Sequence, residues 1–167
     1  MIRGLVIREA DERDSEAIRE LLEAAFETDG ESQLVANLGR NGDKVLELVA
    51  VQEGVLVGEI VFSRLRVAGP EGEFRALALG PLAVLPGRQR TGIGRALIEH
   101  AHPVLTARGE RLCVVLGDPA FYGRFGYTHA RAAGFESHYQ SDYLQALAWG
   151  EAPVSGELRY PAAFEGL

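Results

Sequence analysis

Residues 82–97 bring glycines and arginines together between a short strand pattern and a helical pattern. Leu82 and Val84 alternate as in a strand, and apolar residues recur with helical spacing from Ile93 onward. Unpaired N–H groups at a helix start attract anions, and Gly92 and Gly94 would let a phosphate approach them closely. Positive charge is added around the same turn by Arg88, Arg90 and Arg95. The stretch therefore predicts a cradle for a di- or polyphosphate.

Two familiar phosphate-binding patterns fit this stretch less well. A Walker loop needs Lys-Ser or Lys-Thr after its second glycine, and neither is present. The dinucleotide pattern G-x-G-x-x-G finds two glycines at Gly92 and Gly94, but Leu97 occupies the third position and would hold helix and strand apart. Glu110 lies about where a ribose-binding acid would fall, so a nicotinamide-dinucleotide oxidoreductase stays an alternative. The alternative to a phosphate site of any kind is an ordinary strand-to-helix turn, but the convergence of two glycines and three arginines on one turn favours the phosphate site.

The length and composition of the chain limit the classes of protein to which it can belong. The 167 residues suit a single domain, 1–167, with one sizeable core. No apolar run reaches spanning length and no secretory h-region is seen, so we expect a cytoplasmic protein that engages no membrane. A net charge of −7 argues against general nucleic-acid binding. Cys113 is interpreted as a buried structural thiol, His100 and His102 as surface residues, and no metal cluster is expected.

Hydrophobic periodicity predicts the elements that must position the cradle. An Asp11 cap with Asp14 opens an amphipathic helix that runs to Phe26, and a short second helix covers 33–38. Strands are expected over 5–8, 45–51, 55–67, 74–84, 112–117, 143–149 and 157–160. Further helices are expected over 92–108 and 120–125. The strands over 45–51, 55–67 and 74–84 form an antiparallel meander.

The strand over 74–84 changes phase along its length. Leu77 and Leu79 are odd-numbered apolar positions, whereas Leu82 and Val84 are even-numbered, with Gly80-Pro81 between them. One inserted bulge residue would return both pairs to the same face and bend the strand. A bulged strand leaves backbone groups outside the sheet ladder, where they can meet a ligand. The alternative is a strand buried on both faces.

The glycine loop resembles a motif of a known family. Gln89-x-x-Gly92-x-Gly94, after a Val-x-Pro strand end, resembles the acyl-CoA pyrophosphate loop of the GCN5-related N-acetyltransferases, the GNAT superfamily.

A second segment strengthens that resemblance. Tyr122-x-x-x-Gly126-Tyr127 is similar to the family signature Tyr-x-x-x-Gly-Phe, with Tyr127 in place of its Phe. Asp118-Pro119 stands where many members carry an Asn near the start of the segment, and the run Leu-Gly-Asp-Pro-x-x-Tyr-x-Arg-Phe-Gly-Tyr looks most like the YhbS-type acetyltransferases. The two motifs stand in the family's order, about thirty residues apart.

The resemblance implies an α/β fold: a mixed, mostly antiparallel central sheet with a bulged, splayed strand and helices on both faces. It implies an N-acetyltransferase that moves an acetyl group from acetyl-CoA to a primary amine by direct attack, without a metal. The Leu82 N–H would face the thioester oxygen, and the backbone around Val84 would pair with pantetheine. The implied acetyl-CoA contacts are Leu82, Ala83, Val84, Arg88, Gln89, Arg90, Thr91, Gly92, Ile93, Gly94, Arg95 and Tyr122.

By the same resemblance Tyr122 is the general acid that protonates the leaving thiolate. At a phenol's ordinary pKa, about 10, it would give the pH–rate profile an alkaline limb. The alternative is a packing residue among Phe121, Phe125 and Tyr127. Glu59, Glu31 or water could serve as the base, although each glutamate is more simply explained as a surface acid.

The acceptor and the assembly stay open at this point. The acceptor is an unknown amine, either a small molecule or a protein amino group, and the oligomeric state is undetermined, a homodimer included. A CoA-binding sensor or scaffold without catalysis is the alternative function.

Overall fold

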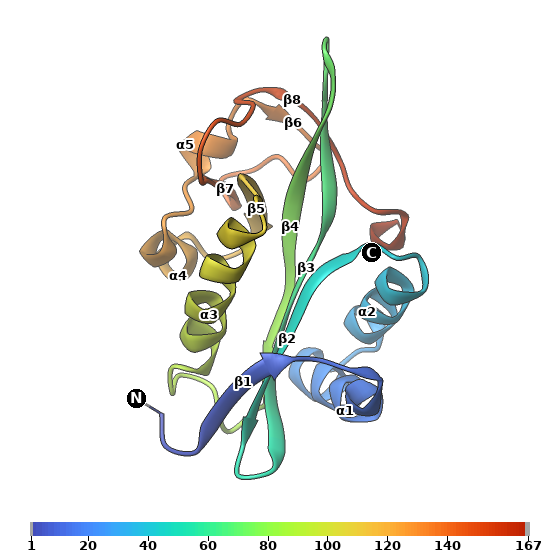
Figure 1. Cartoon of the computed structure of the whole chain (residues 1–167), viewed down its shortest axis with the longest axis vertical. Coiled ribbons are helices and arrows are strands. Elements are labelled where there is room, and N and C mark those ends of the chain that lie inside the picture. Colours follow the sequence, from blue (N-terminus) through green and yellow to red (C-terminus); the bar gives the residue numbers. More distant parts are fainter. Residues whose placement is uncertain (1, 166–167) are drawn as a thin grey trace.

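A computed structural model shows one mixed sheet flanked by helices, and it describes residues 2–165. The sheet order is β1-β2-β3-β4-β5-β7, and β8 pairs with both β3 and β6 (Figure 1). The strands are β1 (Leu5–Glu9), β2 (Lys44–Gln52), β3 (Val55–Gly69), β4 (Gly72–Val84), β5 (Leu112–Leu116), β6 (Phe135–Glu136), β7 (Leu144–Ala148) and β8 (Gly156–Arg159). The helices are α1 (Ser15–Phe26), α2 (Gly30–Arg40), α3 (Ile93–Ala107), α4 (Pro119–Tyr122) and α5 (His129–Ala132).

The predicted meander is confirmed, since β2, β3 and β4 pair antiparallel in sequence order. β1 extends it as a fourth antiparallel strand on β2. β4 and β5 then pair in parallel, which requires the crossover through α3. The expected mixed, mostly antiparallel sheet is therefore present.

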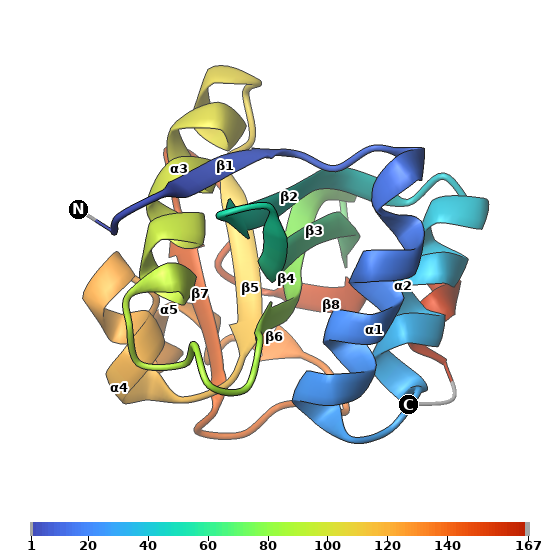
Figure 2. The same ribbon diagram turned by 90° about the horizontal axis from the view of Figure 1, so that it is seen from below.

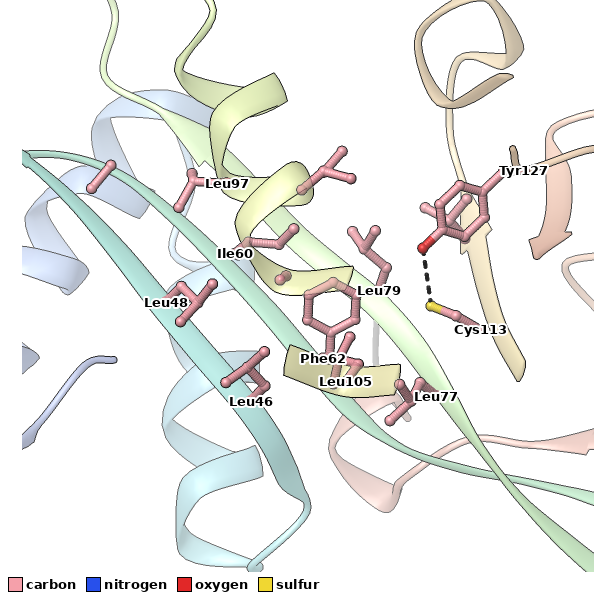
Figure 3. Close-up of a cluster of buried hydrophobic side chains, with 14 of the residues drawn as sticks. Leu46, Leu48, Ile60, Phe62, Leu77, Leu79, Leu97, Leu105, Cys113 and Tyr127 are labelled. Carbon is pink, nitrogen blue, oxygen red and sulfur yellow. Dashed lines mark hydrogen bonds between the residues drawn. The ribbon is translucent and has the colours of Figure 1, made fainter. Parts of the chain in front are cut away.

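Helices cover both faces of this sheet, as predicted. Ile93, Leu97 and Leu105 of α3 pack with Ile60 and other residues of one face (Figure 3). Leu21, Leu22 and Ile18 of α1 and Leu34, Val35 and Leu38 of α2 pack on Val49, Val61 and Ala83 of the other. Figure 2 shows α3 on one side of the strands and α1 with α2 on the opposite side. Within the part of the chain that the structure describes, no helix is long and apolar enough to cross a membrane.

The predicted bulge in β4 is confirmed. Ile60 pairs with Leu82 and Phe62 with Leu79, so that Gly80 and Pro81 together oppose the single residue between them on β3. The extra residue brings the pairs before and after it to the face that α3 covers.

Local sequence explains where α1 begins. Asp11 accepts a hydrogen bond from the backbone of Arg13, and the Asp14 carboxylate accepts one from the Asp11 N–H, forming the expected capping box. This box caps a short 3-10 turn that leads directly into α1.

The structure also departs from the sequence-based expectations. His102 is half-buried rather than a surface residue, because its ring packs against Tyr127 and Trp149. The second helix extends beyond 33–38 to the bounds of α2. α5, the two-residue β6 and a 3-10 turn over Ala162–Phe164 were not anticipated, because each is too short to show periodicity.

Candidate functional site

The ladder between β4 and β5 opens just beyond the bulge. Their pairing ends at Leu79 with Val115, although β4 continues to Val84. The Leu85 N–H donates to the Val57 carbonyl of β3 at 2.8 Å, and successive residues of a strand point their backbone groups to opposite sides. The backbone groups of Leu82 and Val84 therefore point away from β3, toward the opening.

The glycine loop lies beside this opening. A Cβ built on Gly94 would meet Phe121 at 3.6 Å, Leu82 at 3.8 Å and Val84 at 3.9 Å. The first intrahelical bond of α3 runs from the Ala96 N–H to Gly92 at 3.0 Å, so the N–H groups of residues 93–95 have no acceptor within the helix. The start of a fifteen-residue helix thus faces the opened strand with free donors and its positive dipole end.

The loop's conformation depends on particular residues. Gly87 and Gly92 have φ values of +92° and +94°, which favour glycine, and Arg90 adopts +64°. The Thr91 hydroxyl donates to the Arg88 carbonyl at 2.6 Å and braces the turn. The exposed side chains of this loop can therefore contact an anion while they stay at the protein surface.

Of the residues expected to bind acetyl-CoA, most of those in the glycine loop have side chains that are free to meet a ligand. Gln89, Arg90, Thr91 and Arg95 are exposed around the loop, and the Gln89 amide donates to the Val84 carbonyl at 3.2 Å. Ile93 has a buried side chain, so only its backbone can serve a ligand.

The side chains of Arg88 and Ala83, also expected to bind acetyl-CoA, point to other parts of the structure. Arg88 donates to the Gln52 side chain on β2. Ala83 packs its side chain under α1 and α2, and it pairs with Glu59 of β3.

Tyr122 is held at the opening by α4. Asp118 caps this helix by accepting from the Ala120 N–H at 2.9 Å, with Pro119 as its first residue, as expected. A Cβ on Gly117 would lie 2.5 Å from Cε2 of Tyr122, so only glycine lets the ring sit where it does. Burial raises the pKa of Tyr122 to about 12, so its hydroxyl stays protonated at neutral pH.

A hydrogen-bonded group underlies Tyr122. The Tyr127 hydroxyl donates to the Cys113 sulfur at 3.3 Å (Figure 3). It also lies 3.0 Å from Nε2 of His102. Burial lowers the pKa of His102 to about 4 and raises that of Cys113 to about 12, so both are neutral near pH 7. Cys113 is therefore an inert buried thiol, as predicted. The ring of Tyr127 packs edge-on against that of Tyr122, with ring centroids 5.9 Å apart, and so supports it.

A cavity of about 390 Å³ extends from the opening. Its near wall is formed by strand ends and α4, including Gly80, Pro81, Leu82, Val115, Leu116 and Tyr122. Its far wall is formed by α1, α2 and the C-terminal segment, including Phe26, Glu31, Leu34, Tyr139, Tyr160 and Phe164. The cavity thus continues from the splayed strands under α2.

The two candidate bases have different positions. Glu31 is half-buried and lines the cavity. Glu59 is fully buried under α1 and α2 and is not part of the cavity wall, so it is not the surface acid that its simplest interpretation suggested. Within residues 2–165, no group of His, Cys, Asp or Glu side chains could hold a metal ion.

The structure weakens one argument for the dinucleotide alternative and removes one argument against it. Glu110, the candidate ribose acid, forms a bidentate ion pair with Arg64 at 2.7 and 3.0 Å and is held away from the loop. Leu97 does not keep α3 away from the sheet, because Gly58 offers it room; a Cβ there would lie 3.1 Å from Cδ1 of Leu97. Sequence reasoning placed the small residue on the helix, whereas the chain provides it on β3.

Comparison with known proteins assigns the family. Residues 6–130 match the family described as "Acetyltransferase (GNAT) domain". The chain belongs to the GNAT acetyltransferase family.

Its relatives include two Escherichia coli K12 proteins. It is 36% identical to the "Uncharacterized N-acetyltransferase YhbS" over 76% of this chain and 80% of that protein. It is 35% identical to the "Uncharacterized N-acetyltransferase YjhQ" over 89% and 88% of the two chains. The predicted likeness to YhbS is confirmed.

Solved structures agree with this assignment. The crystal structure of E. coli YhbS in complex with CoA has a TM-score of 0.89 and 29% identity, covering 98% of this chain and 93% of that one. A GNAT family acetyltransferase from Brucella melitensis, in complex with acetyl-CoA, has a TM-score of 0.83 and 34% identity, covering 98% and 100%. The expected fold class is thus confirmed by related structures.

Proposed function

We propose that this chain transfers an acetyl group from acetyl-CoA to a primary amine by direct attack. The observation that carries the proposal is the opening between β4 and β5 beside the free N–H groups of α3. Two of the related proteins described above are in complex with CoA or acetyl-CoA, which supports the same ligand here.

Each part of the opening has a role in the proposed binding mode. The N–H groups at the start of α3 and the exposed side chains of Gln89, Arg90, Thr91 and Arg95 take the pyrophosphate. Pantetheine runs along the backbone edge near Val84, where it replaces the Gln89 amide at the Val84 carbonyl, and the thioester lies where the Leu82 N–H points.

The reaction needs no protein nucleophile. The neutral amine's lone pair attacks the thioester carbon, while the Leu82 N–H stabilises the negative charge that develops on the oxygen. The C–S bond then breaks, the nitrogen loses a proton, and Tyr122 donates a hydrogen bond or its proton to the departing sulfur. Starting from an ammonium ion, the products are the acetamide, CoA with its thiol, and one released proton.

Binding and turnover test this proposal together. Isothermal titration with acetyl-CoA should show saturable heat, and the melting temperature should rise, because a ligand selective for the native state stabilises it. CoA release with an amine panel is then followed by a thiol reagent, whose background is small because Cys113 is buried. Binding without CoA release from any amine would instead identify a sensor. The absence of both binding heat and a thermal shift would reject the proposed ligand.

A further inference from the structure

We propose that the acceptor is a monoamine carried on an apolar, aromatic-sized group, with its ammonium paired to Glu31 and its ring on the far wall of the cavity. This inference rests on the proposed acetyl transfer and specifies its acceptor. The cavity is one continuous space from Leu82, at the opening, to Phe164, near the end of the described chain.

The far wall is suited to a flat apolar group. Tyr160 contacts Tyr139 edge-on with ring centroids 5.2 Å apart, and Phe164 with centroids 5.3 Å apart. Phe26 and Leu34 complete this wall from α1 and α2. Burial raises the pKa of Tyr160 to about 12, so its hydroxyl adds no charge near neutral pH. Rings fixed against one another offer contact area at little cost in conformational entropy.

Glu31 gives the cavity its polarity. Among the described residues that line it, Glu31 carries the only charge. Its carboxylate accepts a hydrogen bond from the Thr28 hydroxyl at 3.4 Å, which restrains it near the start of α2. A charge-assisted hydrogen bond would hold the acceptor's ammonium at this carboxylate, and the same nitrogen must pass a proton to Glu31 or to water before its lone pair can attack the thioester.

The same features disfavour other amines. A polyamine would bring a second cation to a wall whose described residues hold no second carboxylate, so that only the ring faces would offset its desolvation. An amino acid would bring its own carboxylate toward Glu31 and be repelled. A long acyl chain could occupy the apolar wall, but it would have no use for the carboxylate, and so we assign the space to the amine.

Substrate pairs test the inference without altering the fold. We expect kcat/KM with acetyl-CoA to be on the order of 10²-fold higher for 2-phenylethylamine than for ethylamine, through burial of the ring. A similar preference is expected over phenylalanine, which differs by one carboxylate, and over spermidine. Titration of the protein–CoA complex with 2-phenylethylamine measures binding independently of turnover.

Variants test the role of Glu31. Glu31→Gln should weaken 2-phenylethylamine binding roughly tenfold, the order of one charge-assisted hydrogen bond, and should narrow the preference over phenylalanine. Affinity for acetyl-CoA should stay unchanged. Glu27→Gln is the matched control, because it removes the same charge from an exposed position outside the cavity.

The outcomes separate the two proposals. If amines are acetylated but 2-phenylethylamine is no better than ethylamine, or if Glu31→Gln and Glu27→Gln behave alike, the acceptor inference is wrong and the acetyl transfer stands. Faster turnover of hexanoyl-CoA than of acetyl-CoA, without preference for the aromatic amine, would assign the cavity to the acyl chain. If 2-phenylethylamine binds through Glu31 but no amine releases CoA, the cavity's occupant is supported and the acetyl transfer fails.

Discussion

Tyr122 shows how a residue's environment changes the chemistry that its type suggests. A free phenol is already a weaker acid than an alkyl thiol, since their pKa values are about 10 and 8.5. The buried site raises the pKa of Tyr122 to about 12, which widens the gap. Complete proton transfer to the thiolate is then less favourable, whereas hydrogen-bond donation to the developing charge is retained. We therefore expect Tyr122 to act mainly as a fixed donor at the sulfur.

Removing only the Tyr122 hydroxyl tests that role. Tyr122→Phe should lower kcat roughly 10²-fold while acetyl-CoA affinity stays near wild type. With a pKa of about 12, Tyr122 should contribute no alkaline limb to the pH–rate profile between pH 6 and 10, contrary to the expectation from an ordinary phenol. Both effects are measured by single-turnover kinetics across that range.

Tyr127→Phe is the matched control for this variant. It deletes a hydroxyl that bonds Cys113 and His102 rather than lining the cavity, so it should lower the melting temperature and leave kcat largely intact. If chemistry is rate-limiting and Tyr122→Phe has the wild-type kcat, Tyr122 is a packing residue.

At the scale of elements, the start of α3 and the opened end of β4 make one surface. Gly94 sits between them, and the space beside its Cα faces Leu82, Val84 and Phe121 at distances typical of ordinary contact. A small side chain there is sterically compatible with the free protein. In the proposed binding mode the same space is needed by the ligand, so a substitution separates folding from binding.

Gly94→Val should abolish CoA binding with little loss of stability. The branched side chain would fill the space beside the free N–H groups of α3, and valine is no worse than glycine in a helix. Titration calorimetry with CoA and thermal unfolding without ligand measure the two effects. Gly94→Ala is the graded control and should bind with intermediate affinity. A folded Gly94→Val protein with wild-type affinity would show that the loop is only a turn.

Sequence patterns predicted the helices and strands in which apolar residues recur at a regular spacing, and also the strand in which that spacing changes phase once. The change from odd to even apolar positions around Gly80-Pro81 located the bulge, and the capping pair Asp11 and Asp14 located the entry to α1. Gly58 and Gly117 were not identified as functional positions, because each matters only through a side chain distant in sequence or across a turn.

The far wall of the cavity was also beyond prediction. Tyr139, Tyr160 and Phe164 lie in segments of one or two turns without periodicity, and only the packing of β8 on β3 brings them beside α2. Glu31 could be proposed from its position in the chain, but its surroundings could not.

For the whole molecule, buried ionisable groups give opposing pH dependences of stability. Hydrogen bonding by Arg8 lowers the pKa of Asp14 to about 2, so its contribution is lost as pH falls through the acid range. Burial lowers the pKa of His102 to about 4, whereas in the unfolded chain the imidazole takes up its proton near pH 6.5. The free energy of unfolding therefore falls as pH decreases from about 6.5 to about 4. Both groups therefore stabilise the fold toward neutral pH.

Glu59 acts in the opposite direction. Both of its carboxyl oxygens and Oε2 of Glu47 are buried without a hydrogen-bond partner, under the face that α1 and α2 cover. Burial, then the adjacent Glu47 carboxyl, raise the pKa of Glu59 well above its ordinary value, although Lys44 partly offsets this. A proton on Glu59 would let it donate to Glu47. The folded state thus binds this proton more tightly than the unfolded chain, and stability falls as pH rises.

Glu59→Gln should remove that loss. Below the ordinary glutamate pKa of about 4.3 both proteins hold a neutral group at this position, so their difference in unfolding free energy should be constant. Above it, wild type should lose up to about 1.4 kcal/mol per pH unit relative to the variant, until the folded-state pKa is passed. Urea unfolding from pH 5 to 9 measures the difference. Unfolding is followed by far-UV circular dichroism rather than by tryptophan fluorescence, because His102 contacts the single Trp149 and its protonation would change that fluorescence. Glu20→Gln, an exposed position of α1, controls for the change in net charge. Parallel curves for wild type and Glu59→Gln would mean that Glu59 is ionised in the folded protein at the same pH as in the unfolded chain.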